Sequence, residues 1–396
     1  MSGTGTTPSI IPLCEPVLRG NEWAYIKECL DTNWVSSVGV FVDRFEREVA
    51  AHVGTKCAVA TINGTAALHV ALLVAGVQPG DEVLTSTLTF VAPANAIRYV
   101  GAHPVFMDAD PVYWQMDVEK VSEFLSKECR WGRRGLENAT TGRRVKAIVP
   151  VDILGHPADM DAIMEVARRF ELVVVEDATE ALGARYKGEA VGRKADIACL
   201  SFNGNKIITT GGGGMIVTDH EGWSQKARHL TTQAKADPVE YIHDEIGFNY
   251  RLTNVQAAMG CAQLEQLGGF IQAKREIARN YACLLASLPG VSPMKESPWA
   301  TSTFWMYTVT LPGAVEIDRR AVSAYMRRQG IQTRPLWQPL HRTPAHRGSQ
   351  AYRCEIAEEL YERAISLPCS ASLEQDAQRR VVTSLAEAIA PVHSSG

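Results

Sequence analysis

The chain has 396 residues, of which 46% are hydrophobic and 21% are charged, and its formal net charge is −4. This composition is ordinary for a soluble globular protein with ample apolar material for a core. The weak negative charge excludes the basic footprint of a nucleic-acid-binding protein, and we interpret the one local basic cluster, within residues 130–144, as a solvated loop.

The nine cysteines are scattered along the sequence, and none forms a C-x-x-C pair. An odd number of dispersed cysteines argues against a disulfide framework and favours reduced thiols. No apolar run approaches the ~20 residues that cross a bilayer, and the opening MSGTGTTPSIIPL lacks the pattern of a secretory signal. We therefore expect a cytoplasmic protein that has neither a membrane nor a nucleic acid as partner.

The N-terminal two thirds of the chain alternate between strand and helix patterns. A loose polar tail is expected at 1–12, followed by helices at 22–32 and 42–52. Apolar strands are then predicted at 57–62, 81–87, 103–108, 145–152, 171–178, 197–203 and 212–219, with helices at 67–76, 94–100 and 159–170 among them. Apolar strands that alternate with helices predict a mostly parallel sheet covered on both faces, the α/β class.

The remainder of the chain is less regular. A long helical pattern covers 254–288, and it is followed by a strand-like segment at 304–311 and by helices at 318–329 and 374–390. This mixture predicts a smaller α+β domain. We place the boundary inside the long helix, which gives a large domain of residues 1–270 and a small C-terminal domain of residues 271–396. Residues 126–144, rich in Arg, Gly, Asn and Thr, are interpreted as an insertion.

The first segment that could carry chemistry joins the strand at 57–62 to the helix after it. Its residues Asn63, Gly64, Thr65 and Ala66 place a glycine and a small hydroxyl residue at the start of a helix. Free backbone N–H groups and the positive end of the helix dipole suit a phosphate there. An ordinary helix cap at Asn63 or Thr65 would give the same pattern.

The second segment is Glu176-Asp177, at the end of the apolar strand at 171–178. Ligands of open α/β sheets bind at the carboxyl ends of the strands. Asp177 could therefore bind a metal, a ribose or a protonated heterocyclic nitrogen, or it could cap a helix.

The third segment is the turn from Ser201 to Lys206, followed by the glycine run 211–214. The run has neither the Gly-Lys-Ser/Thr of a Walker loop nor a dinucleotide fingerprint, and its glycines would let the backbone pass close to a flat cofactor. A lysine enclosed in such a turn loses hydration, so that its neutral amine can attack a carbonyl. A phosphate cradle, an acid and an amine are the protein groups that pyridoxal 5′-phosphate (PLP) needs, and we assign no metal site.

Five segments, NGTAAL, TFVAPANA, EDATEALG, SFNGNKIITTGGGGM and GFNYRLTNVQAAMG, resemble those of the DegT-type sugar aminotransferases, which are fold-type I PLP enzymes. The resemblance runs nearly from end to end. It implies that Lys206 is the Schiff-base lysine and that Asp177 pairs with the pyridine nitrogen. It places Glu180 near the phenolic oxygen, where the family often has Gln or His, and places Asp152 where relatives commonly have His.

The same resemblance implies the other contacts of the site. Gly64, Thr65, Ala66 and Ser201 match the phosphate cradle, and Phe90 matches an aromatic residue that stacks on the ring. Asn249 matches an asparagine that reaches the phosphate from the neighbouring subunit, which implies a homodimer with shared active sites. His341 matches a histidine at the sugar-binding mouth, and Arg251, Trp305 and Trp337 are weaker candidates for sugar contact, since the two aromatics could equally be packing residues.

The opening WVSSVGVFVDRFE and the insertion at 126–144 resemble one branch of this family in particular. Its members transfer an amino group from L-glutamate, through pyridoxamine phosphate, to C4 of UDP-linked 6-deoxy-4-keto N-acetylhexosamines for bacterial glycans. The alternatives are a 3-ketosugar, a dTDP- or GDP-linked ketosugar, or a regulatory protein on the PLP fold. A sugar 3-dehydratase is disfavoured because such relatives replace the lysine with histidine.

Overall fold

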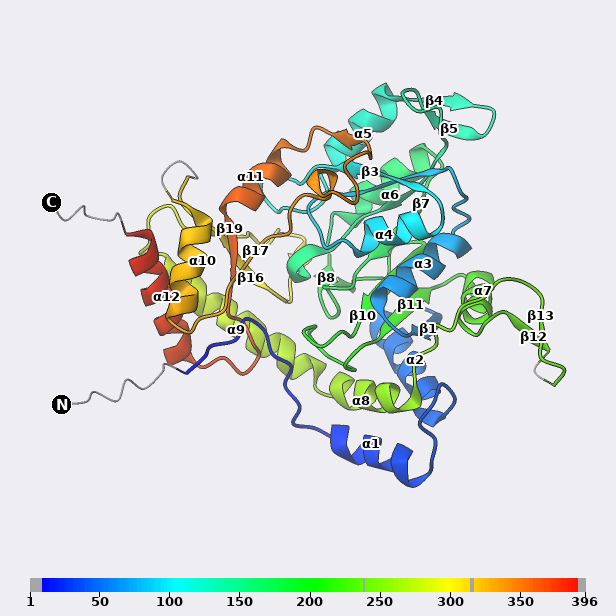
Figure 1. The fold of residues 1–396 in the computed structure, drawn as a ribbon, viewed down its shortest axis with the longest axis horizontal. Coiled ribbons are helices and arrows are strands. Elements are labelled where there is room, and N and C mark those ends of the chain that lie inside the picture. The colour runs from blue at the N-terminus through cyan, green and yellow to red at the C-terminus, as the bar shows by residue number, and fades with distance from the viewer. Residues whose placement is uncertain (1–8, 238, 314–316, 391–396) are drawn as a thin grey trace.

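The computed structural model describes residues 9–237, 239–313 and 317–390. Its centre is an eight-stranded sheet with the order β1-β11-β10-β7-β6-β2-β3-β18 (Figure 1). Five neighbouring pairs, from β10 to β18, are parallel, and only β11 runs antiparallel to both of its neighbours. The strands are β1 (Cys57–Thr61), β2 (Glu82–Ser86), β3 (His103–Met107), β6 (Val145–Val149), β7 (Val173–Asp177), β10 (Ile197–Ser201), β11 (Gly214–Thr218) and β18 (Ala351–Tyr352). The predicted mostly parallel sheet is confirmed.

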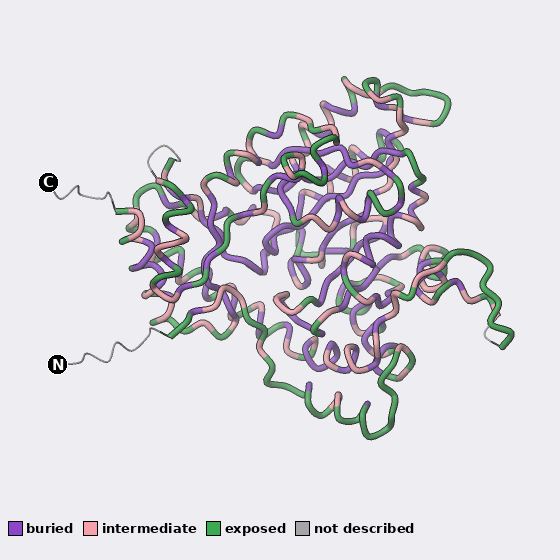
Figure 2. The backbone as a smooth tube through the Cα atoms, viewed as in Figure 1, coloured by how far each residue is buried: buried purple, intermediate pink, exposed green. Residues whose placement is uncertain are grey.

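Helices cover both faces of this sheet, because successive side chains of each strand enter different cores. Val83 packs with the apolar residues of α3 (Gly64–Val74), α4 (Ala92–Tyr99) and α7 (Glu221–Thr231), whereas the next residue, Leu84, packs with α5 (Val118–Lys127) and α6 (Met160–Arg169). Helices α2 (Val40–Val53) and α8 (Asn254–Leu264) cover the same face as α5 and α6, over β1, β10 and β11. The strands consequently form the most continuously buried part of the chain (Figure 2).

The predicted long helix at 254–288 is in fact two helices, α8 and α9 (Leu267–Leu285). At the break, the backbone N–H of Gln266 bonds to the carbonyl of Gln263, three residues back instead of four. Gly268 and Gly269 follow at once, and their backbone freedom weakens a continuous helix. Helix α1 (Glu22–Asp31) packs along α8.

A second, antiparallel sheet has the order β14-β16-β19-β17 and lies with α10 (Arg319–Arg328) and α12 (Gln375–Ile389) beside the far end of α9, at the left of Figure 1. Its strands are β14 (Ser292–Pro293), β16 (Tyr307–Thr310), β17 (Arg334–Pro335) and β19 (Ala364–Leu367). Strand β18 and helix α11 (Glu355–Arg363) come between β17 and β19, and β18 pairs with β3 of the large sheet. We propose that the chain divides near residue 270, within α9.

Smaller elements complete the fold. The insertion at 126–144 contains a hairpin of β4 (Cys129–Gly132) and β5 (Gly135–Asn138). Short pairings also join β8 (Arg185–Tyr186), β9 (Glu189–Ala190) and β15 (Ala300–Thr301), and likewise β12 (Lys235–Asp237) and β13 (Ile242–His243), and two 3-10 turns are η1 (Ile153–Gly155) and η2 (Leu340–Arg342). All nine cysteines are free thiols. No helix in the described part of the chain has the length and hydropathy needed to cross a membrane.

The expected tail at 1–12 lies partly outside the described residues. Within them, Ile11 is buried and forms a parallel bridge with Ile331. Its backbone N–H donates to the carbonyl of Gly330 at 2.8 Å, and its carbonyl accepts from the N–H of Gln332 at 2.9 Å. The start of the described chain is therefore held against the segment that leads into β17.

Candidate active site

The turn between β1 and α3 meets the end of β10. The side chain of Asn63 accepts a hydrogen bond from the N–H of Ala66 at 2.8 Å, so Asn63 caps α3. A Cβ atom on Gly64 would lie 3.0 Å from the Cβ of Ser201 and 3.1 Å from the Cγ2 of Thr179. A glycine at this position lets the first turn of α3 approach the carboxyl ends of β7 and β10.

A cavity of about 650 Å³ opens at this place. Eight of the thirteen site residues predicted from the sequence line it, namely Gly64, Thr65, Phe90, Glu180, Ser201, Lys206, Trp305 and Trp337. Ser201 ends a strand of the large sheet, whereas Trp305 and Trp337 lie next to β16 and β17 of the second sheet, so the fold gathers residues up to 273 positions apart. The volume falls in the range of small-molecule sites in proteins.

Lys206 lies in the turn after β10, and its side chain is 14% exposed. Its ammonium nitrogen, Nζ, is 3.7 Å from Oε1 of Glu180 and 4.1 Å from the ring centroid of Trp305. The Trp305 indole N–H donates to the carbonyl of Asn205 at 2.7 Å. Trp305 therefore orders the lysine turn and forms one wall beside Lys206.

The position of Trp305 depends on a glycine that the sequence analysis did not single out. Gly155, in η1, has φ +87°, and a Cβ atom there would lie 2.7 Å from the backbone nitrogen of Trp305. Its carbonyl accepts from the N–H of Thr303 at 2.9 Å. In the same turn, the N–H of Leu154 donates to Oε2 of Glu180 at 2.9 Å. This turn thus fixes both neighbours of Lys206.

Asp177 and Glu180 are buried carboxyl groups at the end of β7. Asp177 is 2% exposed and does not line the cavity, and its Oδ1 accepts from the N–H of Thr179 at 3.1 Å. Burial raises the pKa of both carboxyl groups above their ordinary values, and the positive charge of Lys206 opposes this effect at each. The lysine and the two acids thus form one electrostatic unit.

A second pair of acids lies directly behind Asp177. Asp152 and Glu176 are 0% and 1% exposed, and within the described residues Oδ2 of Asp152 and Oε2 of Glu176 are buried without a hydrogen-bond donor. Oδ1 of Asp152 also accepts from the N–H of Ala158 at 2.8 Å, and Oε1 of Glu176 accepts from the N–H of Gly192 at 3.1 Å. Burial, with the charge of Glu176 second, raises the pKa of Asp152 well above its ordinary value. The raised pKa favours the protonated form of Asp152, which supplies a donor that this pair of carboxyl groups otherwise lacks.

Five predicted residues do not line the cavity: Ala66, Asp177, Asn249, Arg251 and His341. The imidazole of His341 lies between Thr87 Oγ1, 2.7 Å from Nδ1, and Glu358 Oε1, 2.9 Å from Nε2. Both ring nitrogens are thus engaged within the protein.

Arg251 and Asn249, which also do not line the cavity, follow one another closely in the sequence, and Arg251 lies beside the end of β1. Arg251 forms an isolated bridge with Thr61, and its Nη2 is 3.9 Å from Oδ1 of Asp43. Asn249 is exposed and forms a bridge with Thr232. Neither residue lines the cavity of its own chain.

The structure also adds residues to the cavity. Its wall includes Cys14 and Glu15, which are close to the start of the described chain. It also includes Arg334, in β17, and Gln332, shortly before that strand. Their positions follow from the pairing of Ile11 with Ile331, a long-range contact that no local sequence pattern reveals.

The glycine run 211–214, which we expected close to the cofactor, does not line the cavity. A Cβ atom on Gly214 would lie 2.5 Å from the backbone carbonyl of Asn63. Gly214 therefore lets β11 pass beside the turn that begins α3.

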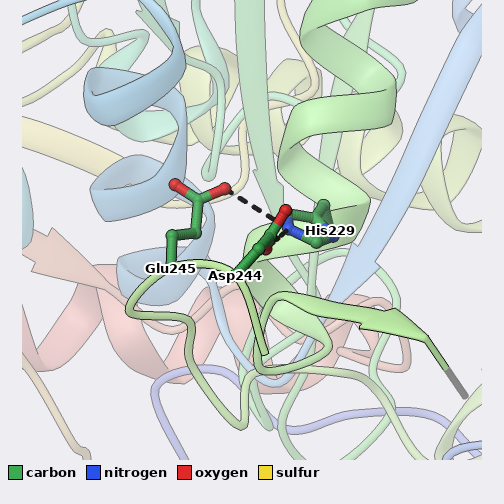
Figure 3. A group of neighbouring side chains, drawn as sticks. All are labelled: His229, Asp244 and Glu245. Carbon is green, nitrogen blue, oxygen red and sulfur yellow. Dashed lines mark hydrogen bonds and ion pairs between the residues drawn. The ribbon is translucent and has the colours of Figure 1, made fainter. Parts of the chain in front are cut away.

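One group of side chains within the described residues has the spacing of metal ligands, namely His229, Asp244 and Glu245 (Figure 3). Nε2 of His229 is 2.7 Å from Asp244 Oδ1 and 3.3 Å from Glu245 Oε1. Lys226 also pairs with Glu245. The group lies on α7 and the loop after β13, outside the cavity, and is satisfied by its own ion pairs.

Comparison with known proteins assigns the chain to a family. Residues 16–386 match the DegT/DnrJ/EryC1/StrS aminotransferase family. GDP-perosamine synthases from Escherichia coli O157:H7 and Caulobacter vibrioides are 41% and 40% identical, over 92% and 95% of this chain and 95% and 97% of theirs. The crystal structure of the aminotransferase TlmJ from Streptoalloteichus hindustanus aligns with a TM-score of 0.87 and 28% identity, over 96% of this chain and 99% of that one. The protein belongs to the DegT/DnrJ/EryC1/StrS aminotransferases, and its fold is that of the fold-type I PLP enzymes.

Proposed function

We propose that this protein transfers an amino group from L-glutamate to C4 of a nucleotide-linked 6-deoxy-4-ketosugar. The observation that carries the proposal is the placement of Lys206 between Glu180 and Trp305, in a cavity that also exposes Gly64, Thr65 and Ser201. The cavity thus combines an amine, a buried carboxyl group and the N-terminus of a helix that can bind a phosphate. The family membership supplies the reaction class.

The residues of the cavity fit PLP. The N-terminus of α3, with Gly64, Thr65 and Ser201, suits the phosphate, because backbone N–H groups and the helix dipole favour an anion. Asp177, buried behind the cavity wall, suits the pyridine nitrogen, and Phe90 suits the ring face. When it is bound, PLP supplies an electron sink for the bond that is broken at the amino donor.

The chain's own groups supply the proton transfer. Lys206 Nζ would take a proton from the α-carbon of the amino donor and pass it to the bound cofactor, and in the second half-reaction it would carry a proton from the cofactor to C4 of the sugar. The hydrogen bond from Leu154 and the lysine charge both favour the ionised form of Glu180, against the cost of its burial. Glu180 therefore keeps the amine of Lys206 oriented toward the cavity. Arg334, at the wall of the cavity, is a cation suited to a carboxylate or a phosphate of the substrate.

Two nucleotides are candidates for the sugar carrier. The sequence resemblance favours a UDP-linked N-acetylhexosamine, whereas the two relatives near 40% identity are named for GDP-perosamine, whose formation aminates C4 of a GDP-sugar. Both alternatives share amination at C4, which our proposal retains.

The proposal includes a homodimer with shared sites. Asn249 lies on the surface of its own chain and away from its own cavity, as a residue that serves a partner's cavity would. A stable dimer of this kind would bury an interface of the obligate type.

A substrate panel tests the proposal. Purified protein with PLP and L-glutamate is incubated with 4-keto-6-deoxy sugars on GDP, UDP and dTDP and with a 3-ketosugar, and the products are identified by NMR. Formation of 2-oxoglutarate and a 4-amino sugar supports the proposal, and the preferred nucleotide decides between the two carriers. Amination at C3 alone would contradict it, and PLP binding with no amino transfer to any sugar would favour the regulatory alternative.

A further inference from the structure

Behind the lysine turn lies a second reactive cluster, formed by Cys14, Lys274 and Cys369. Nζ of Lys274 is 3.4 Å from Sγ of Cys14 and 3.7 Å from Sγ of Cys369, and it donates to the carbonyl of Trp305 at 2.8 Å. The segments are held in register, because the N–H of Cys369 donates to the carbonyl of Leu13 at 2.8 Å. The three side chains come from three distant parts of the chain.

Lys274 needs an anion that only a sulfur can provide. The side chain is 4% exposed, and among the described residues Nζ has no hydrogen bond or ion pair with a carboxylate. A buried ammonium group without a counter-charge is costly. The hydrogen-bond partners of Nζ are one carbonyl and two sulfurs, so a thiolate is the available counter-charge.

The two sulfurs have different roles. The thiol of Cys369 donates to the carbonyl of Trp305 at 3.4 Å. The neighbouring Cys369, together with Lys274, lowers the pKa of Cys14 to about 6, against the effect of burial. The proximity of Cys14 and burial raise the pKa of Cys369 well above its ordinary value. Burial alone would lower the pKa of Lys274, but the two neighbouring sulfurs raise it. Cys14 is therefore the thiolate and Cys369 the thiol.

The cluster is connected to the active site on one side. Cys14 is partly exposed and lines the cavity, whereas Cys369 is buried. In its thiol form Cys14 donates a hydrogen bond to the carbonyl of Asn205, the residue before Lys206, at 3.5 Å, and the thiolate gives up this bond. A small reagent in the cavity can thus reach the thiolate but not the thiol.

We propose that Cys14 is an oxidant-sensitive modification site, at which hydrogen peroxide produces a disulfide between Cys14 and Cys369. In the first step the Cys14 thiolate attacks one peroxide oxygen and the O–O bond breaks. The other oxygen leaves as hydroxide, and Cys14 becomes a sulfenic acid. In the second step the sulfur of Cys369 attacks the sulfenic sulfur, its proton leaves with the hydroxyl group as water, and the S–S bond forms. The two sulfurs together lose two electrons, and the peroxide gains them.

Alkylation of the holoprotein by iodoacetamide across a pH series is the first test. Near pH 7 a pKa of about 6 makes the thiolate fraction about 30-fold larger than for an ordinary thiol with a pKa near 8.5, but lower basicity reduces its intrinsic reactivity about 13-fold. The net gain is only about twofold, so the pH of half-maximal labelling is the sharper readout. We expect it near pH 6 for Cys14, and a value in the ordinary range near 8.5 would overturn the proposal.

The chain offers matched controls for this profile. Cys129 is also partly exposed, but burial raises its pKa to about 12, so it should remain unlabelled where Cys14 reacts. The exposed Cys283 is removed by Cys283→Ser. Lys274→Met should move the Cys14 profile to higher pH and Lys274→Arg should restore it. An unchanged profile in a folded Lys274→Met protein would contradict the role of the ammonium group.

Peroxide treatment tests the covalent step. We expect peptide mapping of Cys283→Ser holoprotein, blocked with N-ethylmaleimide, to show a Cys14–Cys369 cross-linked peptide that dithiothreitol removes. Cys369→Ser should instead accumulate sulfenic and sulfinic acid at Cys14. Over-oxidation of Cys14 in the parent protein without a cross-link, or a cross-link that joins either cysteine to a different one, would overturn the assigned pair.

Discussion

The substitution Asp152→Asn tests the buried acid pair behind Asp177 with little change in shape. An asparagine oxygen can still accept the hydrogen bond from the N–H of Ala158, and its NH₂ group can still donate to Glu176. The variant thus reproduces the protonated state of Asp152 but has no proton to lose. Any difference from the parent protein that varies with pH then reports on that proton.

The sign and size of the effect follow from the raised pKa of Asp152. Its ordinary value is 3.8, and burial with the charge of Glu176 raises it. A group with a raised pKa contributes stability that is complete below its unfolded pKa and is lost as the pH rises through the folded pKa. One such proton lowers the free energy of unfolding by about 1.4 kcal/mol per pH unit in that window. We therefore expect Asp152→Asn to gain stability over the parent protein as the pH rises above about 4.

Urea unfolding of the two apoproteins, followed by circular dichroism from about pH 5 to pH 8, measures this difference. Asp161→Asn is the control, because ion pairs with Lys187 and then Lys194 lower the pKa of Asp161 to about 2. The stability from Asp161 is complete above its unfolded pKa, so the control should differ from the parent protein by a constant amount in this range. Parallel pH profiles for Asp152→Asn and the parent protein would refute a retained proton at Asp152.

Three further predictions concern catalysis. Lys206→Ala should bind PLP but lose amino transfer. In the parent protein, borohydride should fix the cofactor to Lys206, and an adduct found on another lysine by mass spectrometry would contradict the assignment. Asp177→Asn should lose most of its turnover and keep its circular dichroism spectrum, because an amide cannot hold the pyridinium proton, whereas near-normal turnover would make Asp177 a structural residue only. Mixing inactive Lys206→Ala with inactive Asn249→Asp should restore part of the activity as subunits exchange, because one site of each mixed dimer then carries neither change. No recovery of activity despite demonstrated exchange would show that Asn249 serves its own subunit.

The sequence was most informative where chemistry depends on short segments. The predicted site residues between Asn63 and Ser201 are mostly at the carboxyl ends of β1, β7 and β10. The sheet brings these strand ends to one edge. The strand patterns therefore predicted both the sheet and the inner half of the cavity. The break between α8 and α9 was missed because it depends on one shifted hydrogen bond at Gln266, which leaves the apolar periodicity intact.

The outer half of the cavity could not be found in this way. Cys14 and Arg334 line it because Ile11 pairs with Ile331, 320 residues later in the sequence. Such a contact has no local signature. The same holds for Gly155, whose need for a glycine arises from the backbone of Trp305 and not from its own neighbours in the sequence.

The pairing of the N-terminal segment with the residues before β17 also imposes an order on biosynthesis. The segment around Ile11 leaves the ribosome long before its partners, because Ile331 is translated 320 residues later and Cys369 later still. The part of the cavity formed by Gly64, Ser201 and Lys206 can thus form on the nascent chain well before the wall that contains Cys14. Until Ile331 and Cys369 have been synthesised, the N-terminal segment has no docking site, and the cavity lacks this wall beside Lys206.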